Sequence, residues 1–351
     1  MYFPPLRPIA IATLAVLSLT LFTLTSQAEE PQGKAAAAVA APEKLPELFS
    51  GAKNVVFLGD SITYGGRYIE IIEGVVRTKF YDLDLDFINV GLPSETVSGL
   101  SEPGHAGGKF PRPDVHERLV RMFDKLHPDV VFACYGMNCG IYHPLGEERF
   151  KAYREKMQLL HDIATQQGAQ IVHLTPPPFD PQPLAGKTLP AGLEEYRQPF
   201  EGYDSVLEAY SKWLLSKRDE GWTVIDLHGP MNDYLKQQRK QDPKFVLAGD
   251  GVHHGATGQW LMAKQVLMTL FPSDKDIAAA ASLEVLMPAG TTNAKLLDLV
   301  AQRQRVRKDA WLTEIGHLRP GMNPGKSVKE AEAEAAAIEA SIRKLSISSA
   351  P

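Results

Sequence analysis

The fold class is indicated most clearly by residues 54–62, Asn54-Val55-Val56-Phe57-Leu58-Gly59-Asp60-Ser61-Ile62. Its four consecutive apolar residues, 55–58, predict a fully buried strand that ends at Gly59. Continuous apolar runs of this kind are typical of parallel sheets that are covered on both faces. A helical pattern over residues 68–79 follows. A strand followed by a helix is the start of a βαβ unit, so the sequence favours an α/β fold.

The alternation of apolar runs and amphipathic stretches continues along the chain. Further strands are predicted at 83–90, where leucine and phenylalanine alternate with aspartate, and at 129–134, 170–175 and 223–227. Helices are predicted at 146–168, 203–217 and 257–270. Within the first of these helices, apolar residues recur at spacings of three and four: Phe150, Tyr153, Met157, Leu160 and Ala164. We therefore expect a parallel sheet with helices on both faces.

Composition excludes several classes of protein. The 351 residues include 37 basic and 42 acidic side chains, a net charge of −5, which does not suit a general nucleic-acid binder. Hydrophobic residues make up 44%, enough for a packed core. The two cysteines, Cys134 and Cys139, exclude a disulfide-stapled fold, a zinc cluster of cysteines and an iron–sulfur site. We expect no metal and no other cofactor.

The N-terminal residues predict an export signal. Arg7 precedes an apolar run over residues 9–24, and Ser26-Gln27-Ala28 has the small-x-small pattern that signal peptidase cleaves. We therefore expect a signal peptide over 1–28, a tether over 29–50, and a periplasmic or secreted protein without a stable membrane span after cleavage. An uncleaved membrane anchor is the alternative, which the threonines and serines of the run disfavour.

The sequence divides the remainder into a main domain, 51–272, and an extension, 273–351. The extension is rich in alanine and charged residues, and the stretches 295–311 and 327–345 are predicted helices. We expect it to pack on the main domain or on a partner subunit. Within the main domain, prolines at 176–178 and 181 open a long loop that runs to about residue 200. Long loops at the carboxyl end of a strand are often lids or binding loops.

Three side chains along the chain suit nucleophilic catalysis. Ser61 follows the first strand, at the sheet edge where ligand sites of α/β folds lie. A serine needs a base, and Asp250-Gly251-Val252-His253 places a carboxylate and an imidazole three residues apart. His254 is the second choice for the base. Taken singly, Asp60 and Ser61 could be ordinary helix-capping residues.

Two further residues follow neighbouring strands and could stabilise an oxyanion. Gly91 comes after the second strand, where its amide N–H has no side chain to obstruct it. Asn138 comes after the third strand and carries an amide donor. The alternatives are a plain turn glycine and an Asx turn.

The sequence resembles the SGNH hydrolases, also called the GDSL esterase/lipase family. The resemblance lies in the sequence blocks of that family, which are matched here in order by Ser61, Gly91, Asn138 and the Asp250–His253 pair. The resemblance covers about residues 53–271. It implies a flavodoxin-like three-layer α/β/α sandwich and a serine ester hydrolase that needs no metal. It also implies an oxyanion hole formed by Ser61 N–H, Gly91 and Asn138.

The third block departs from the family pattern Gly-x-Asn-Asp, because Cys139 stands in the place of the aspartate. In the family this aspartate commonly supports the loop, so its loss puts the rigidity of Asn138 in question. Cys139 would be a nucleophile only with a base nearby and a lowered pKa. Cys134, inside an apolar strand, is most simply a core residue.

Long inserts and C-terminal helical segments such as 311–317 resemble those of secreted bacterial members that accompany polysaccharide degradation. This implies a small-molecule or carbohydrate acyl ester as substrate, with acetyl favoured. Aromatic residues in the loops could face sugar rings or pack on the sheet: Tyr64, Tyr135, Tyr142, Phe179 and Tyr196. The alternatives are an acyltransferase or lipase with the same residues, and a non-catalytic carbohydrate-binding or envelope interaction protein.

Overall fold

The strand predicted at 55–58 is the first along the chain in a five-stranded parallel sheet. The computed structural model describes residues 45–80 and 84–348. The sheet has the order β2-β1-β3-β4-β5, and its strands are β1 (Asn54–Gly59), β2 (Asp86–Asn89), β3 (Val130–Cys134), β4 (Gln170–Leu174) and β5 (Thr223–Ile225). All four pairings are parallel. This is the flavodoxin-like strand order, so the predicted fold class is confirmed.

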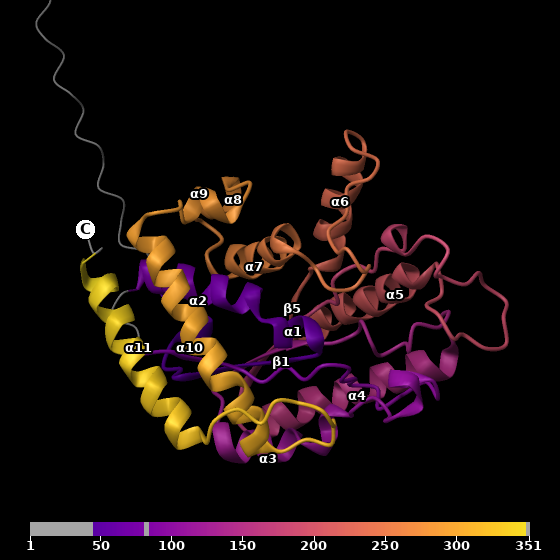
Figure 1. The fold of residues 1–351 in the computed structure, drawn as a ribbon, viewed down its shortest axis with the longest axis horizontal. Coiled ribbons are helices and arrows are strands. Elements are labelled where there is room, and N and C mark those ends of the chain that lie inside the picture. The colour runs from indigo at the N-terminus through magenta and orange to yellow at the C-terminus, as the bar shows by residue number, and fades with distance from the viewer. Residues whose placement is uncertain (1–44, 81–83, 349–351) are drawn as a thin grey trace, which may run out of the picture. The chain divides into compact units, whose positions relative to one another are not determined.

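Helices cover both faces of the sheet, which makes three layers. On one side α2 (Arg67–Lys79) lies beside α7 (Ala256–Leu270), and on the other lie α3 (Leu119–Leu126) and α4 (Glu147–Gln166) (Figure 1). Helix α5 (Tyr203–Ser216) packs against α4, where the rings of Tyr153 and Tyr210 stack with centroids 4.0 Å apart. Four of the five apolar residues that predicted α4 are buried, namely Tyr153, Met157, Leu160 and Ala164.

Among the described helices of eight or more residues, α3 and α6 (His228–Arg239) were not among the sequence predictions. Helix α6 begins His-Gly-Pro, residues that usually indicate a turn. Pro230 is tolerated because it lies in the first turn, where the N–H groups have no partner within the helix. The remaining short helices are α1 (Ser61–Gly65), α8 (Lys275–Ala279) and α9 (Leu283–Leu286).

The C-terminal extension packs on the main domain through two long helices, α10 (Thr292–Ile315) and α11 (Val328–Ser348). Helix α10 lies along α2 and α11 along α10 (Figure 1). Strand β2 is an edge of the sheet, and its Phe87 carbonyl accepts hydrogen bonds from Gln304 (2.9 Å) and Arg307 (3.3 Å) of α10. The extension therefore covers an edge strand that would otherwise expose unpaired backbone groups.

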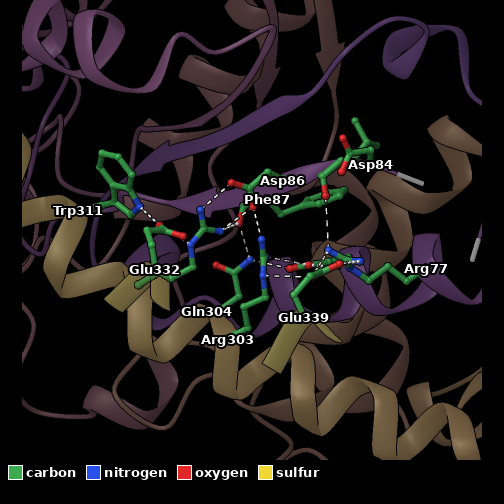
Figure 2. Close-up of polar contacts among 12 residues, drawn as sticks. Arg77, Asp84, Asp86, Phe87, Arg303, Gln304, Trp311, Glu332 and Glu339 are labelled. Carbon is green, nitrogen blue, oxygen red and sulfur yellow. Dashed lines mark hydrogen bonds and ion pairs between the residues drawn. The ribbon is translucent and has the colours of Figure 1, made fainter. Parts of the chain in front are cut away.

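Charged side chains hold this contact together (Figure 2). Asp86 of β2 accepts a bidentate ion pair from Arg307 (2.7 and 2.6 Å), and also binds Arg303. Glu339 of α11 pairs with Arg77 of α2 through two bonds of 3.0 Å. The strand predicted over 83–90 is shorter in the structure, where β2 spans Asp86–Asn89 and pairs with β1 from Asp86, opposite Asn54, onward; residue 83 lies outside the described residues.

The export signal predicted over 1–28 and most of the tether predicted over 29–50 lie outside the described residues. The end of the predicted tether, from Leu45, is folded onto the domain. Phe49 is 1% exposed, and its ring lies edge-on to Phe87 at 6.0 Å. An apolar residue at this position anchors the chain just before β1.

Candidate active site

Ser61 is the first residue of α1, directly after β1. Asp60 caps this helix by accepting the Ile62 N–H at 2.9 Å. Gly59 makes the tight connection possible, because a Cβ there would lie 2.1 Å from Thr63 Oγ1 and 2.8 Å from the Cys134 carbonyl. The turn therefore presents the serine hydroxyl at the carboxyl edge of the sheet, as predicted.

Ser61, His253 and Asp250 are joined by a continuous chain of hydrogen bonds. Ser61 Oγ lies 2.8 Å from His253 Nε2, and His253 Nδ1 lies 2.7 Å from Asp250 Oδ2. The other carboxylate oxygen of Asp250 accepts the backbone N–H groups of Val252 (3.0 Å) and His253 (2.7 Å). Partial burial acts to raise the pKa of Asp250, but the hydrogen bonds from His253 and Val252 outweigh it and lower the pKa. The carboxylate thus stays ionised beside the imidazole.

His254, the second choice for the base, lies elsewhere. Its side chain is buried, and burial lowers its pKa to about 4. It packs against Gly258 at the start of α7, where a Cβ would lie 2.7 Å from the His254 Cβ. The structure therefore pairs Ser61 with His253 and leaves His254 in the core.

The Gly91 amide is engaged within its own loop. Its N–H donates to Asn89 Oδ1 at 2.9 Å. A Cβ at this position would lie 2.4 Å from Tyr64 N and 2.7 Å from the Thr63 carbonyl carbon, so only glycine permits β2 to approach α1 this closely. Gly91 as an oxyanion donor stays a prediction, and it would require this hydrogen bond to be exchanged.

Three residues further on, Ser94 offers a second amide. Pro93 and Ser94 form the centre of a turn that is closed by the Glu95 N–H to the Leu92 carbonyl, at 3.1 Å. Ser94 has φ 70°, a conformation for which such a turn usually requires glycine. Its N–H has no hydrogen-bond partner among the described residues. A proline followed by a small residue is the only sequence signal for this turn.

Asn138 is fixed by neighbours from two loops. Its Nδ2 donates to the Glu95 carbonyl at 3.2 Å, and its Oδ1 accepts from the Tyr142 hydroxyl at 3.1 Å. Because an amide nitrogen carries two protons, one remains for a ligand. Beneath this loop the fully buried Glu95 carboxylate pairs with Arg118 through two bonds of 2.7 Å and accepts the Tyr135 hydroxyl at 2.6 Å.

Both cysteines are buried and unbridged. Burial raises the pKa of Cys139 to about 12, so its thiol is protonated and is not a nucleophile near neutral pH. Its Sγ accepts the Val97 N–H at 3.4 Å, and its carbonyl accepts the Ser98 hydroxyl at 3.0 Å. Cys139 therefore still ties the loop after β3 to the loop after β2, the support that its departure from the family pattern had put in question.

Sequence reasoning missed one set of contacts to the serine turn. Tyr64, three residues after Ser61, donates its hydroxyl to Asp309 Oδ1 at 2.8 Å. The Lys308 ammonium donates to the Tyr64 carbonyl at 2.8 Å and lies 3.7 Å from the centroid of its ring. Both partners lie in α10, more than 240 residues away. No local pattern could have shown that the extension touches the site.

The described residues contain neither a metal-binding cluster nor a membrane-spanning helix. Residues 45–80 and 84–348 contain no group of three or more histidine, cysteine, aspartate or glutamate side chains arranged to hold a metal ion. Among the helices of this same region, none is long and apolar enough to cross a membrane.

Comparison with known proteins gives a family match and several structural likenesses. Residues 57–261, more than half of the chain, match the GDSL-like lipase/acylhydrolase family. No curated protein matches the sequence. One similar structure is an acetylxylan esterase, Axe2, from Geobacillus stearothermophilus, with 18% identity and a TM-score of 0.45, over 62% of this chain and 94% of that one.

A second similar structure is a gut microbial diltiazem-metabolising enzyme, with 22% identity and a TM-score of 0.43, over 62% of this chain. The chain matches less than half of that enzyme, 46%. The family match spans β1 through most of α7 and so includes Ser61, Asn138 and His253. The chain therefore belongs to the GDSL-like lipase/acylhydrolase family, the SGNH hydrolases, and is a carboxylic ester hydrolase.

Proposed function

We propose that Ser61, His253 and Asp250 form a catalytic triad that removes small acyl groups, acetyl above all, from a carbohydrate. The single observation that carries the proposal is the hydrogen-bond chain from Ser61 Oγ through His253 to Asp250, with distances of 2.8 and 2.7 Å. A serine that is joined to an imidazole in this way has the base that it needs to become a nucleophile.

In the first half of the reaction, Ser61 Oγ attacks the acyl carbonyl carbon while its proton passes to His253 Nε2. Asp250 holds the imidazole by Nδ1 and stabilises its charged form. When the tetrahedral intermediate collapses, the bond to the alcohol breaks and His253 returns the proton to the departing oxygen. Water then repeats the sequence on the acyl-serine, which releases the acid and restores the hydroxyl.

The negative charge on the tetrahedral oxygen requires donors, which we assign to the Ser61 N–H and to Asn138 Nδ2, with Gly91 or Ser94 as the third. The free N–H of Ser94 favours this residue, whereas the N–H of Gly91 is already bound to Asn89. Donors that are fixed before the reaction begins usually contribute the largest share of the rate enhancement.

Two features support a small acyl group on a bulky alcohol. The side chain of His253 is 53% exposed and that of Asp250 55%, so the site opens at the surface, where a large alcohol part has room. The pocket near Asn138 is lined by several charged and polar side chains, which do not suit a long hydrocarbon chain. Export directed by the signal predicted at 1–28 would bring the enzyme to extracellular carbohydrate, and we propose a periplasmic or secreted location.

Ser61→Ala tests the proposal. The variant is expected to lose hydrolysis of p-nitrophenyl acetate and labelling by a fluorophosphonate probe, while its circular dichroism spectrum and melting temperature stay those of the wild type. Ser205→Ala, which removes a hydroxyl at the start of α5, is the matched control and keeps both activities. Hydrolysis by Ser61→Ala would refute the assignment, and a wild type that does not react with the probe would favour the non-catalytic binding protein.

A further inference from the structure

A pocket of about 860 Å³ lies beside the loop that holds Asn138. Three loops form it: residues 102–104 and 112 after β2, residues 141–143 after β3, and residues 194–199 of the long loop after β4. Its size falls within the range of about 300–1,000 Å³ that is typical of sites for small organic ligands. Nothing in the triad or in the oxyanion donors uses it.

Tyr142 connects this pocket to the reacting centre. Its hydroxyl donates to Asn138 Oδ1, the residue that we assign to the oxyanion hole. Tyr142 has φ 57° and the preceding Ile141 has φ 48°, conformations that cost energy in residues other than glycine. Backbone strain of this kind is often found at ligand sites. The wall of the pocket is therefore continuous with the site.

Arg112 supplies a free donor in the pocket. Its side chain is only 8% exposed and binds Glu102 through Nε and Nη2, both at 2.7 Å. The guanidinium carbon lies 5.3 Å from the centroid of the Tyr142 ring, which also stacks on Tyr203 with centroids 4.9 Å apart. The third nitrogen, Nη1, has no partner among the described residues. A buried guanidinium with one open N–H edge is a preorganised donor.

The charges of the lining are largely paired with one another. Arg112 is bound to Glu102, and Arg197 to Glu195 at 3.3 Å, which leaves Glu194 as the unpaired charge. This balance gives no positive field for an anionic ligand. A hydrocarbon chain would have to bury these ion pairs without replacing their water. A neutral molecule rich in hydroxyl groups needs no positive field and can replace the water around the ion pairs. Its hydroxyl groups accept from Arg112 and donate to the glutamates.

The long loop that closes the pocket is fixed in place. The Phe200 N–H donates to the Tyr142 carbonyl at 2.8 Å, and Leu189 N–H donates to the Pro199 carbonyl at 2.9 Å. The Tyr196 ring lies 5.2 Å from His143, centroid to centroid, and its hydroxyl donates to the Pro190 carbonyl at 3.0 Å. The pocket therefore exists before a ligand arrives, which lowers the entropy lost on binding.

We propose that this pocket binds the alcohol part of the ester, a neutral oligosaccharide, and that Arg112 donates to its hydroxyl groups through Nη1. This inference rests on the proposed function and adds to it the residues that select the substrate. Loss of one hydrogen bond from a charged donor weakens binding by about tenfold. The expected effect is thus on KM for sugar esters.

The test compares two esters of the same acid, acetylated xylotriose and methyl acetate, whose alcohol is too small to fill the pocket. Arg112→Gln is expected to lower the ratio of their kcat/KM values, sugar ester over methyl ester, by about tenfold. Gln198→Ala, at the exposed rim, is expected to lower it about threefold. Lys187→Ala, on the same loop but outside the lining, is the control and leaves the ratio unchanged.

An unchanged ratio in Arg112→Gln and Gln198→Ala would overturn the proposal. It would also be overturned if these variants lost kcat/KM on methyl octanoate more than on the sugar ester, since the pocket would then hold the acyl chain. A wild type that hydrolyses neither ester would refute the proposed function alone. Titration calorimetry with unmodified xylotriose tests the pocket independently: binding that weakens about tenfold in Arg112→Gln supports it, and no binding to the wild type overturns it.

Discussion

Ser61 and the Asp250–His253 pair meet in one hydrogen-bonded chain, yet the protein holds them in different ways. Ser61 lies on a short helix whose Thr63 carbonyl accepts from Asn89 of β2 at 2.7 Å and whose Tyr64 is bound by α10 of the extension. Asp250 and His253 lie in a surface loop, and about half of each side chain is exposed. Apart from the hydrogen bond to Ser61, the hydrogen bonds of these two side chains join residues no more than three positions apart in the sequence. The serine is thus held by long-range contacts and the Asp250–His253 pair by local ones.

This difference separates two kinds of mutational effect. By the proposed mechanism, a substitution of Asp250 or His253 removes activity and leaves the core intact, because little apolar surface is buried there. A substitution behind the serine half first removes stability, since the contacts that hold the turn also join the extension to the sheet. In the proposed mechanism the base needs only correct orientation, which a local turn supplies, whereas the serine must also lie close to backbone donors from neighbouring loops.

The largest effect is expected from the exposed half. His253→Ala removes the only imidazole that contacts Ser61 among the described residues, and by the proposed mechanism kcat should fall by about 10⁴-fold or more. Because the side chain is half exposed, we expect the melting temperature to change by no more than about 2 °C. Steady-state kinetics on p-nitrophenyl acetate and thermal unfolding measure both. A large loss of stability would contradict the separation of the two halves.

The next largest effect is expected behind the serine half. Glu73 is fully buried on α2 and accepts from Arg77 (2.8 Å), Gln304 (2.6 Å) and Arg303 (3.3 Å). Glu73→Gln removes the negative charge that compensates the buried guanidinium groups of Arg77 and Arg303. The free energy of unfolding should therefore fall by about 3–5 kcal/mol. Urea denaturation measures it.

The matched control is Glu208→Gln on α5, whose partner Lys212 is exposed, and it should change the free energy of unfolding by less than about 0.5 kcal/mol. Activity of Glu73→Gln should be lost over the same urea range as its folded structure. If Glu73→Gln is no more destabilised than the control, the charged contacts of α10 do not hold the extension.

A pH-dependent effect of intermediate size is expected from Asp60, the cap of the serine helix. Burial raises the pKa of Asp60 to about 6. The hydrogen bond from the Ile62 N–H and the nearby charge of Arg112 act to lower this pKa, but burial outweighs them. The native state therefore retains a proton that the unfolded chain releases near pH 4, so stability is full below that pH and declines as pH rises through 6. Asp60→Asn keeps the capping oxygen and does not titrate.

Between pH 4 and pH 8 the wild type should lose about 2 kcal/mol of unfolding free energy relative to Asp60→Asn. Guanidinium chloride denaturation of both proteins at several pH values measures the difference. Parallel curves would show that Asp60 is ionised in the native protein throughout this range, and hence that its site is better solvated than its 2% exposure indicates.

The same division explains what sequence could predict. The strand at 55–58, the serine that follows it and the spacing between Asp250 and His253 are local patterns, and the structure brings these side chains together. The Gly91 bond to Asn89 and the free Ser94 amide depend on the course of a loop without regular structure. Contacts from α10 to Tyr64 join residues more than 240 positions apart, a distance that no periodicity spans.

The smallest effect is expected where the extension touches the serine helix. Lys308→Met keeps the length of the side chain but removes the hydrogen bond to the Tyr64 carbonyl and the contact of the ammonium with the ring. Stability should fall by about 1 kcal/mol. Because Tyr64 lies one turn after Ser61, we also expect kcat and the rate of fluorophosphonate labelling to fall about threefold together, with KM unchanged.

Two variants distinguish positioning of the serine from a general loss of stability. Lys308→Arg keeps a cation over the Tyr64 ring and should restore most of the labelling rate. Lys295→Met makes the same change at an exposed position of α10 and should leave labelling as in the wild type. If Lys308→Met lost stability but labelled at the normal rate, α10 would support only the fold and would not position the serine turn. A fall in labelling rate well below the melting temperature would instead show that the extension positions the nucleophile.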